Sequence, residues 1–426
     1  MNRSVNDTQR EYIERAQRVL AGGSLGNIYD DIVLCEGNGA RVRDVAGNEY
    51  IDYLLGSGPM LVGHRHPEVT AAVKTQIEKG ATFFATNDQS IALAERIVDA
   101  YPCAEKIRFM ASGSEATAYA MRAVRAFRRR DLMMKFEGGF HGMHDSALMS
   151  WEPAQPPEFP RAVPDSAGIP EHVAGQMLIA PFNDIQTTTE LIRSHSDSLA
   201  GVIVEPMQRL IPPQPDFLSE LREVTEKYSV PLIFDEIVTG FRLAYGGAQE
   251  YYGVTPDLCT LNKAMSGGYP LSVVAGRADI MAGFSPESKN GGGYMPQLTT
   301  FGGNPISSAA SLAVLEILRR PGTYDRLFET GRKLMQALER LFADAAIAAQ
   351  IVGEPPVFDI FFTDVPITDY RSSLSGDTGK LNRFRQLLLE RGVYRGHSKM
   401  YISIAHTDAD VAETTEVFKD AINHLC

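Results

Sequence analysis

Two strand ends in the sequence carry side chains that could take part in chemistry, the carboxylate of Asp235 and the amine of Lys263. The run PLIFDEIVTGFR predicts a buried strand ending at Asp235, which places a carboxylate at the carboxyl edge of a parallel sheet, where α/β proteins bind ligands. In DLCTLNKAMSGGYP a second apolar strand leads to Lys263 and a Ser-Gly-Gly turn, and a lysine amine there is suited to forming a Schiff base. Each motif alone has other interpretations: LIFDE fits a Walker-B strand or an ordinary strand-end acid, and Lys263 fits a lysine that extends to water.

Two segments with the pattern of a loop followed by a helix could bind an anion. In RFMASGSEATAYAM a strand is followed by the Ser112–Glu115 turn and an amphipathic helix, whose first N–H groups would be free to bind phosphate. In LTTFGGNP, Thr299 and Thr300 precede another helix start and can present hydroxyls and amides to an anion. The simpler interpretation in both places is a helix cap, with a Ser112–Glu115 capping box in the first.

The segment KFEGGFHGMHD brings an aromatic ring and a histidine to a glycine turn. Phe140 could stack on a planar ring, although a loop aromatic also serves to cover the edge of a core. His141 and His144 stand three residues apart, but no third ligand has suitable spacing, so we expect no metal site.

Composition and missing motifs exclude several classes of protein. The chain has 426 residues and a net charge of -12, which argues against a nucleic-acid surface or a polybasic membrane anchor. It has no GxxxxGKS/T loop and no GxGxxG fingerprint, so the P-loop ATPase and Rossmann interpretations lose their support. The 4 cysteines form no CxxC pair, no secretory signal opens the chain, and no long apolar run predicts a membrane span. We therefore expect a cytoplasmic protein.

The elements that must position these residues follow an α/β pattern. From Pro67 to about Pro321, short apolar runs alternate with amphipathic helical segments, which predicts a mainly parallel sheet covered by helices. ARVRDVAGNEYIDYLLG predicts a β-hairpin near the start. After Pro321 the pattern changes to long helices and a single strand. We expect an N-terminal segment over 1–60 that packs with a small α+β domain over 321–426, and a large domain over 61–320.

The order of these motifs resembles the class III aminotransferases, which are fold-type I pyridoxal-phosphate enzymes. Within them the chain is most similar to the glutamate-1-semialdehyde aminomutase-like branch. The resemblance extends from GGSLG and GHRHPEV, through SGSEA, VEP and DEIVTGFR, to TFGGNP and the C-terminal SIAHTDADV. It implies an α/β fold with a mainly parallel seven-stranded sheet in the large domain, and pyridoxal 5'-phosphate as cofactor.

The resemblance also implies roles for single residues. Lys263 is similar to the Schiff-base lysine and proton shuttle, and Asp235 to the acid that pairs with the pyridinium nitrogen. Thr300 matches a threonine that reaches the phosphate of a neighbouring subunit, which implies a homodimer with shared active sites. The full set of cofactor-binding residues implied is Ser112, Gly113, Ser114, Phe140, His141, Glu205, Asp235, Ile237, Lys263 and Thr300.

The chain departs from the aminomutase pattern near the expected substrate site. An arginine of that pattern, which holds a substrate carboxylate, is replaced in a stretch that contains Asn27 and Tyr29, and a bulky tryptophan is replaced by Ser57. The family's Ala-Gly-Asn after VEP is replaced by Gln208-Arg209-Leu210. The substrate candidates are therefore Tyr29, Ser57 and Arg395, the last being the nearest basic candidate for a carboxylate clamp together with His397 and Lys399. A solvated loop is the alternative for those three.

We expect an aminotransferase that moves an amino group from an amine or amino acid donor to a 2-oxo acid acceptor by a ping-pong mechanism. An aminomutase of the glutamate-1-semialdehyde type or a racemase is the alternative with the same cofactor. A cofactor-free interaction module and a Schiff-base aldolase are further alternatives, but neither has a use for both Lys263 and Asp235.

Overall fold

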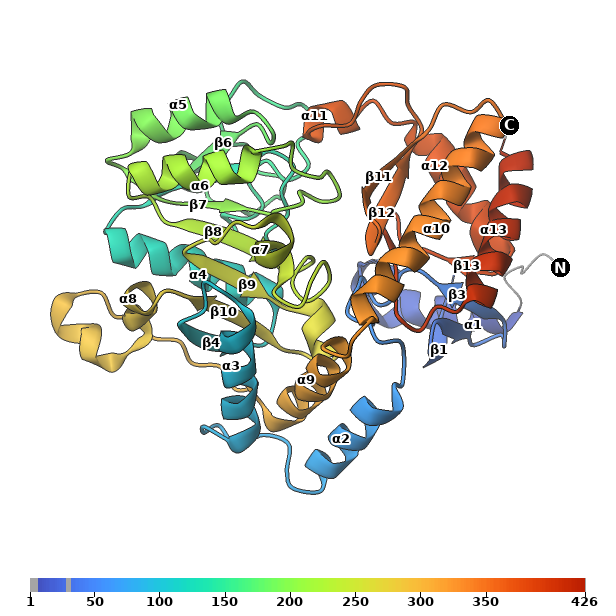
Figure 1. The fold of residues 1–426 in the computed structure, drawn as a ribbon, viewed down its shortest axis with the longest axis horizontal. Helices are drawn as coiled ribbons and strands as arrows, with labels where there is room; N and C mark the ends of the chain where they lie inside the picture. Colours follow the sequence, from blue (N-terminus) through green and yellow to red (C-terminus); the bar gives the residue numbers. More distant parts are fainter. Residues whose placement is uncertain (1–6, 28–31, 426) are drawn as a thin grey trace. The chain divides into compact units, whose positions relative to one another are not determined.

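A computed structural model describes residues 7–27 and 32–425 of the chain, which form two compact units (Figure 1). The small unit comprises the described residues of Met1–Pro67, Arg320–Pro366 and Ser375–Cys426. The large unit comprises Glu68–Arg319 and Ile367–Leu374. No helix among these described residues is both long enough and apolar enough to cross a membrane.

The large unit is built on a seven-stranded sheet with the order β4-β10-β9-β8-β7-β5-β6. Only β10 runs against its neighbours, so the prediction of a mainly parallel sheet is confirmed. Every residue of the strands β6, β7, β8, β9 and β10 is buried. This explains why their sequences are short, continuous apolar runs. The strands are β4 (Lys106–Met110), β5 (Leu132–Phe136), β6 (Met177–Ala180), β7 (Leu199–Val204), β8 (Leu232–Glu236), β9 (Leu258–Leu261) and β10 (Ser272–Gly276).

Helices cover this sheet, and α4 packs against β7, β9 and β10. Its small apolar residues, such as Ala116 and Ala120, are fully buried there and allow close approach to the strands. Helix α3 packs against α9, and α5 against α6. The helices assigned to this unit, of which α2 starts at the boundary, are α2 (Pro67–Ile77), α3 (Asp88–Ala100), α4 (Gly113–Arg128), α5 (Ile185–His195), α6 (Phe217–Lys227), α7 (Gly247–Tyr252), α8 (Ala278–Met281), α9 (Pro305–Leu318) and α11 (Tyr370–Ser373).

Helix α11 lies outside the continuous stretch that we expected for the large domain. Its Arg371 donates to Glu137 at 2.8 Å, and the Tyr370 hydroxyl donates to the Pro153 carbonyl at 3.2 Å. These contacts join residues 367–374 to the large unit, although the sequence suggested that they belong to the C-terminal domain. Pairings between residues more than 200 positions apart leave no local pattern to read.

The small unit contains two sheets, with the orders β1-β2-β3-β13 and β11-β12-β14. The predicted hairpin is present as β2 and β3, and β13 pairs with β3, so early and late parts of the chain share one sheet. Phe342, Phe362 and Phe384 form an aromatic cluster in its core. The elements are α1 (Asp7–Val19), β1 (Leu34–Asn38), β2 (Arg41–Asp44), β3 (Glu49–Asp52), α10 (Thr323–Asp344), β11 (Gln350–Glu354), β12 (Val357–Phe361), α12 (Thr378–Glu390), β13 (Val393–Tyr394), β14 (Met400–Tyr401) and α13 (Asp408–Asn423).

Candidate active site

The two residues with which the sequence analysis began lie at the same edge of the sheet. Strands β8 and β9 are parallel neighbours, and Asp235 on β8 is opposite Thr260 on β9. Lys263 follows the end of β9 and begins a short 3₁₀ helix over Lys263–Ser266. Both side chains therefore start from the carboxyl edge of the sheet, where parallel α/β proteins bind ligands.

Donors from three different elements hold the carboxylate of Asp235. His141 donates from Nδ1 to Oδ2 at 2.7 Å, the Thr260 hydroxyl donates to Oδ1 at 2.9 Å, and the Ile237 amide donates to Oδ1 at 3.2 Å. Asp235 is only 4% exposed, so these bonds are shielded from water. A carboxylate has about four lone-pair sites, so one remains for a further donor. We call Asp235, His141, Thr260 and Ile237 the Asp235 cluster.

The loop after β5 that contains Phe140 and His141 is held through its backbone. The Thr117 hydroxyl on α4 donates to the His141 carbonyl at 2.5 Å, and the Phe140 amide donates to Glu205 at 2.9 Å. The ring of Phe140 is partly buried and lies 5.1 Å from that of Trp151. The structure thus brings Phe140 and Glu205 into contact, and His141 and Asp235 into contact, as neighbouring pairs.

The amine of Lys263 forms no hydrogen bond with any residue in 7–27 or 32–425, and the side chain is partly buried. The backbone of Lys263 has φ +44°, in the left-handed region that non-glycine residues seldom adopt. Asn262 caps this turn by accepting the Lys263 amide, and the Ser266 hydroxyl donates to the Lys263 carbonyl at 3.0 Å. A strained backbone held in this way is common where a functional side chain must be aimed.

The start of α4 contains the predicted capping box. Ser112 accepts the Glu115 amide at 3.3 Å, and Glu115 accepts the amide of Ser112 at 3.1 Å. The cap does not use the amides of Gly113 and Ser114, which are the first two of the helix and have no acceptor among the described residues. Ile237 lies close to Gly113: a Cβ atom placed on Gly113 would be 3.3 Å from the Ile237 side chain. The cap and an anion site are therefore compatible.

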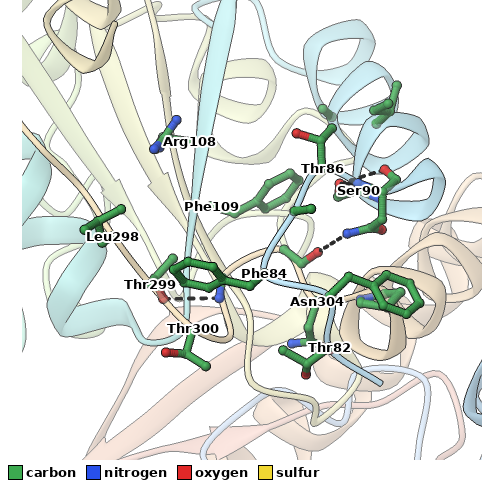
Figure 2. Close-up of a pocket in the computed structure, with 18 of the residues that line it drawn as sticks. Thr82, Phe84, Thr86, Ser90, Arg108, Phe109, Leu298, Thr299, Thr300 and Asn304 are labelled. Atoms are coloured by element: carbon green, nitrogen blue, oxygen red, sulfur yellow. Dashed lines mark hydrogen bonds between the residues drawn. The ribbon is translucent and has the colours of Figure 1, made fainter. Parts of the chain in front are cut away.

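Thr300 lies elsewhere in the large unit, on a cavity of about 460 Å³ (Figure 2). The cavity wall also contains Thr82, Phe84, Arg108 and Leu298, and none of the Asp235 cluster. Thr300 itself is exposed. Its neighbours act as local caps: Thr299 accepts the Gly302 amide at 3.2 Å, and Asn304 accepts the Ser307 amide at 2.9 Å at the start of α9. We call this feature the Thr300 cavity.

The three substrate candidates have different environments. Tyr29 lies outside the described residues. Ser57, in the small unit, is exposed and has φ +67°. Arg395, also in the small unit, is 1% exposed and donates to Asp359 at 2.5 Å. The alternative of a solvated loop is therefore wrong for Arg395, which is neutralised by a buried carboxylate.

Three residues that hold the site were not identified from the sequence. Thr260 precedes Lys263 on the predicted strand, and Thr117 lies one turn into α4, but nothing in their spacing indicates which side chain they bind. Lys135 on β5 is fully buried and donates to the carbonyls of Ala147 and Met149 at 2.9 and 2.7 Å. It thereby fixes the loop that leads to Trp151, and burial lowers its pKa to about 7.

The chemical groups at this site match those that pyridoxal phosphate requires. Asp235 retains one acceptor position for a ring N–H, and the amides of Gly113 and Ser114 suit a phosphate. Phe140 and Ile237 offer apolar surface for a flat ring, and the unbonded amine of Lys263 is available for a Schiff base.

Comparison with known proteins agrees with this chemistry. The sequence model of the family Aminotransferase class-III matches residues 26–422. Two relatives named glutamate-1-semialdehyde 2,1-aminomutase, from Desulforudis audaxviator and Sulfurihydrogenibium azorense, are 40% and 36% identical over 95% and 98% of this chain and 95% and 99% of their own. The solved structure of an omega-transaminase from Sphaerobacter thermophilus is 33% identical, covers 99% of both chains and has a TM-score of 0.94. The chain therefore belongs to the class III aminotransferase family of pyridoxal-phosphate enzymes.

Proposed function

We propose that this pyridoxal-phosphate enzyme is an aminotransferase that moves an amino group from an amine or amino acid donor to a 2-oxo acid. One observation carries the proposal: a buried carboxylate, Asp235, is held by three donors at a sheet edge. The neighbouring strand is followed by Lys263, whose amine forms no hydrogen bond with the described residues. Family membership and the omega-transaminase structure support the same class of chemistry.

When bound, the cofactor supplies a carbonyl carbon that takes up the amino group and a ring that delocalises the electrons left by a lost proton. Asp235 keeps a proton on the ring nitrogen, because an ionised acceptor at that position favours the charged form of its partner. His141 and Thr260 hold the carboxylate at a fixed angle, so that its free lone pair points in a single direction. This arrangement needs no reorganisation during the reaction.

Lys263 has two tasks in this proposal. Its amine holds the cofactor in the resting enzyme, and after displacement by the donor it takes the proton from the carbon that bears the donor's amino group. It would pass that proton to the cofactor carbon that receives the amino group, and in the second half of the cycle it would move a proton from that carbon to the 2-oxo acid carbon. Both tasks require an amine that no other protein group binds, which agrees with its surroundings.

Phe140 and Ile237 would cover the two faces of the ring, which excludes water from the reacting atoms. Glu205 holds the backbone of Phe140, and Ile237 lies close to Gly113 at the start of α4.

We also propose that two copies of the chain share their active sites through Thr300. Thr300 is exposed on its cavity, and the cavity includes no member of the Asp235 cluster. Phe84 and Leu298 in its wall are 69% and 85% exposed, which is typical of a surface that another protein covers.

A second candidate function is that of an aminomutase, because both relatives in the sequence comparison carry the name glutamate-1-semialdehyde 2,1-aminomutase. The residues of this chain argue for the transaminase, since Asn27 lies in the stretch where that pattern has its carboxylate-binding arginine, and Ser57 replaces a tryptophan. Sustained turnover separates the two. A transaminase consumes donor amines only while pyruvate or 2-oxoglutarate is supplied, whereas an aminomutase converts glutamate-1-semialdehyde completely without an added 2-oxo acid.

A further inference from the structure

Arg209 lies at the tip of a tight turn beside the candidate active site. The turn follows β7 and is closed by two hydrogen bonds between the backbones of Gln208 and Ile211, at 3.0 and 2.8 Å. Strand β7 is the parallel neighbour of β8, which carries Asp235, so the turn extends from the same edge of the sheet.

The backbone and side chain of Arg209 are both unusual. Its φ is +60°, in the region that favours glycine. The guanidinium carbon lies 5.6 Å from the centre of the Phe140 ring, and the residue is partly buried. A left-handed conformation is unfavourable for arginine, so the packing around the turn must hold it.

Within residues 7–27 and 32–425, the guanidinium of Arg209 has no anionic partner. In the part of the chain that the structure describes, it forms no ion pair and its side chain donates no hydrogen bond, which leaves five N–H donors for a ligand. The nearby carboxylate of Glu205 already accepts the Phe140 amide. Other arginines that could bind a carboxylate are engaged: Arg371 pairs with Glu137, and Arg395 pairs with Asp359.

We propose that Arg209 binds the carboxylate of an amino acid donor and of the 2-oxo acid acceptor, next to Phe140. The inference rests on the proposed function and names its substrate class: carboxylate-bearing compounds. A planar guanidinium pairs with a carboxylate through two parallel N–H bonds, and the adjoining aromatic face limits the competition from water.

The test uses the holoenzyme and a pair of probes that differ only in charge, propanoate and its neutral analogue propanamide. Binding is followed by the change in the visible spectrum of the cofactor and, independently, by ligand-observed NMR. Arg209→Met removes the charge and keeps an unbranched, apolar side-chain stem. It should weaken propanoate binding by about 10- to 100-fold and leave propanamide binding within about twofold. Arg209→Lys should give an intermediate loss, since an ammonium pairs with only one carboxylate oxygen at a time.

The matched control is Arg129→Met. Arg129 is an arginine of the same unit with φ +55°, and it donates to the Gly291 carbonyl at 2.8 Å. This variant should bind propanoate as the wild type does. Turnover supplies a second readout: Arg209→Met should raise the KM for pyruvate by a similar factor with a much smaller change in kcat.

Equal losses of propanoate and propanamide binding in Arg209→Met would overturn the proposal, as would an unchanged affinity for propanoate. If Arg395→Met loses propanoate binding and Arg209→Met does not, the proposal is also overturned, because Arg395 of the small unit would then be the residue that binds the carboxylate. The proposed function fails in a different way, because it predicts a Schiff base on Lys263 and amino transfer in the wild type. Propanoate binding by NMR requires neither.

Discussion

The Asp235 cluster and the Thr300 cavity differ in how far a single chain completes them. In the cluster, both carboxylate oxygens of Asp235 are bound by protein donors, and the residue is 4% exposed. In the cavity, Thr300 is exposed, and Phe84 and Leu298 present large apolar side chains to solvent. One region is formed by folding alone, whereas the other exposes apolar surface, which we have proposed that a second copy covers.

The difference indicates where each kind of chemistry is expected to reside. Proton transfer and charge stabilisation need donors that are fixed before the substrate arrives, and the cluster provides them. Contacts to a cofactor phosphate can come from a second copy, because hydroxyls and amides at a loop need only be brought to the right place. Disruption of the cluster should therefore affect the chemical step, and disruption of the cavity should affect assembly.

The largest effect is expected for Lys263→Ala, which removes the proposed base of the candidate active site. The value of kcat should fall by at least about 10³-fold, because proton transfer and the covalent attachment are both lost. Stopped-flow measurement of a single half-reaction checks this, with circular dichroism as the control for folding. Turnover within tenfold of the wild type would refute the role of Lys263.

A somewhat smaller loss is expected for Asp235→Asn, which keeps the size of the side chain and removes its charge. The value of kcat should fall by about 10²- to 10³-fold, since the ring nitrogen loses its ionised partner.

The neighbouring acid provides the control for Asp235→Asn. Glu236 is buried, accepts the Ala248 amide at 2.5 Å and has its pKa raised by burial to about 7. Glu236→Gln should lower stability but change kcat per folded molecule less than about fivefold. Equal losses of kcat in the two variants would contradict a special role for Asp235.

A substitution in the wall of the Thr300 cavity should weaken association of two copies, so its effect should depend on protein concentration. Phe84 in the wall of the Thr300 cavity is 69% exposed, and Phe84→Ser should weaken association of two copies by roughly 10- to 100-fold without changing the melting of the large unit. Analytical ultracentrifugation measures the association, and specific activity should fall on dilution.

The matched control for the cavity is Phe127→Ser, because Phe127 on α4 is 43% exposed and lies outside the cavity wall. It should leave association unchanged. If both variants remain associated at the dilutions where the wild type does, the cavity is not part of an interface.

The smallest effect concerns the stability of the small unit. The Ser403 amide donates to His406 Nδ1 at 3.0 Å, so this nitrogen acts as an acceptor, and burial lowers the pKa of His406 to about 4. Between about pH 4 and 6.5 the unfolded chain binds more protons than the folded chain, so stability falls as pH falls through this range.

The contribution of His406 amounts to about 2–3 kcal/mol of unfolding free energy, present above pH 6.5 and lost near pH 4. Urea titrations of the wild type and His406→Gln should show a difference that depends on pH in this range. At neutral pH the visible spectrum of the cofactor should be the same in both proteins. A difference in stability that does not change with pH would contradict the account.

Much of the fold and the core of the site follow from local patterns. Apolar runs that end in Asp235 and shortly before Lys263 predicted two strand ends, and the structure places these strands next to each other. The hairpin at β2 and β3 and the long helix α10 were likewise predictable, because turn residues and helical periodicity act over a few positions.

The remaining features depend on contacts between distant parts of the chain. The bond from His141 to Asp235 spans 94 positions, and the buried pair of Arg395 and Asp359 spans 36. The left-handed backbones of Lys263 and Arg209 were not predictable either, because neither residue type favours a positive φ. Such features are set by tertiary packing, which local sequence does not encode.

Reduction of the holoenzyme with borohydride, followed by peptide mass spectrometry, tests the central claim most directly. Borohydride converts a Schiff base into a stable secondary amine, so the label marks the lysine that held the cofactor. The account predicts one pyridoxyl group per chain, attached to Lys263, and its absence from Lys263→Ala. A label on another lysine, or an unlabelled chain with the cofactor bound, would contradict it.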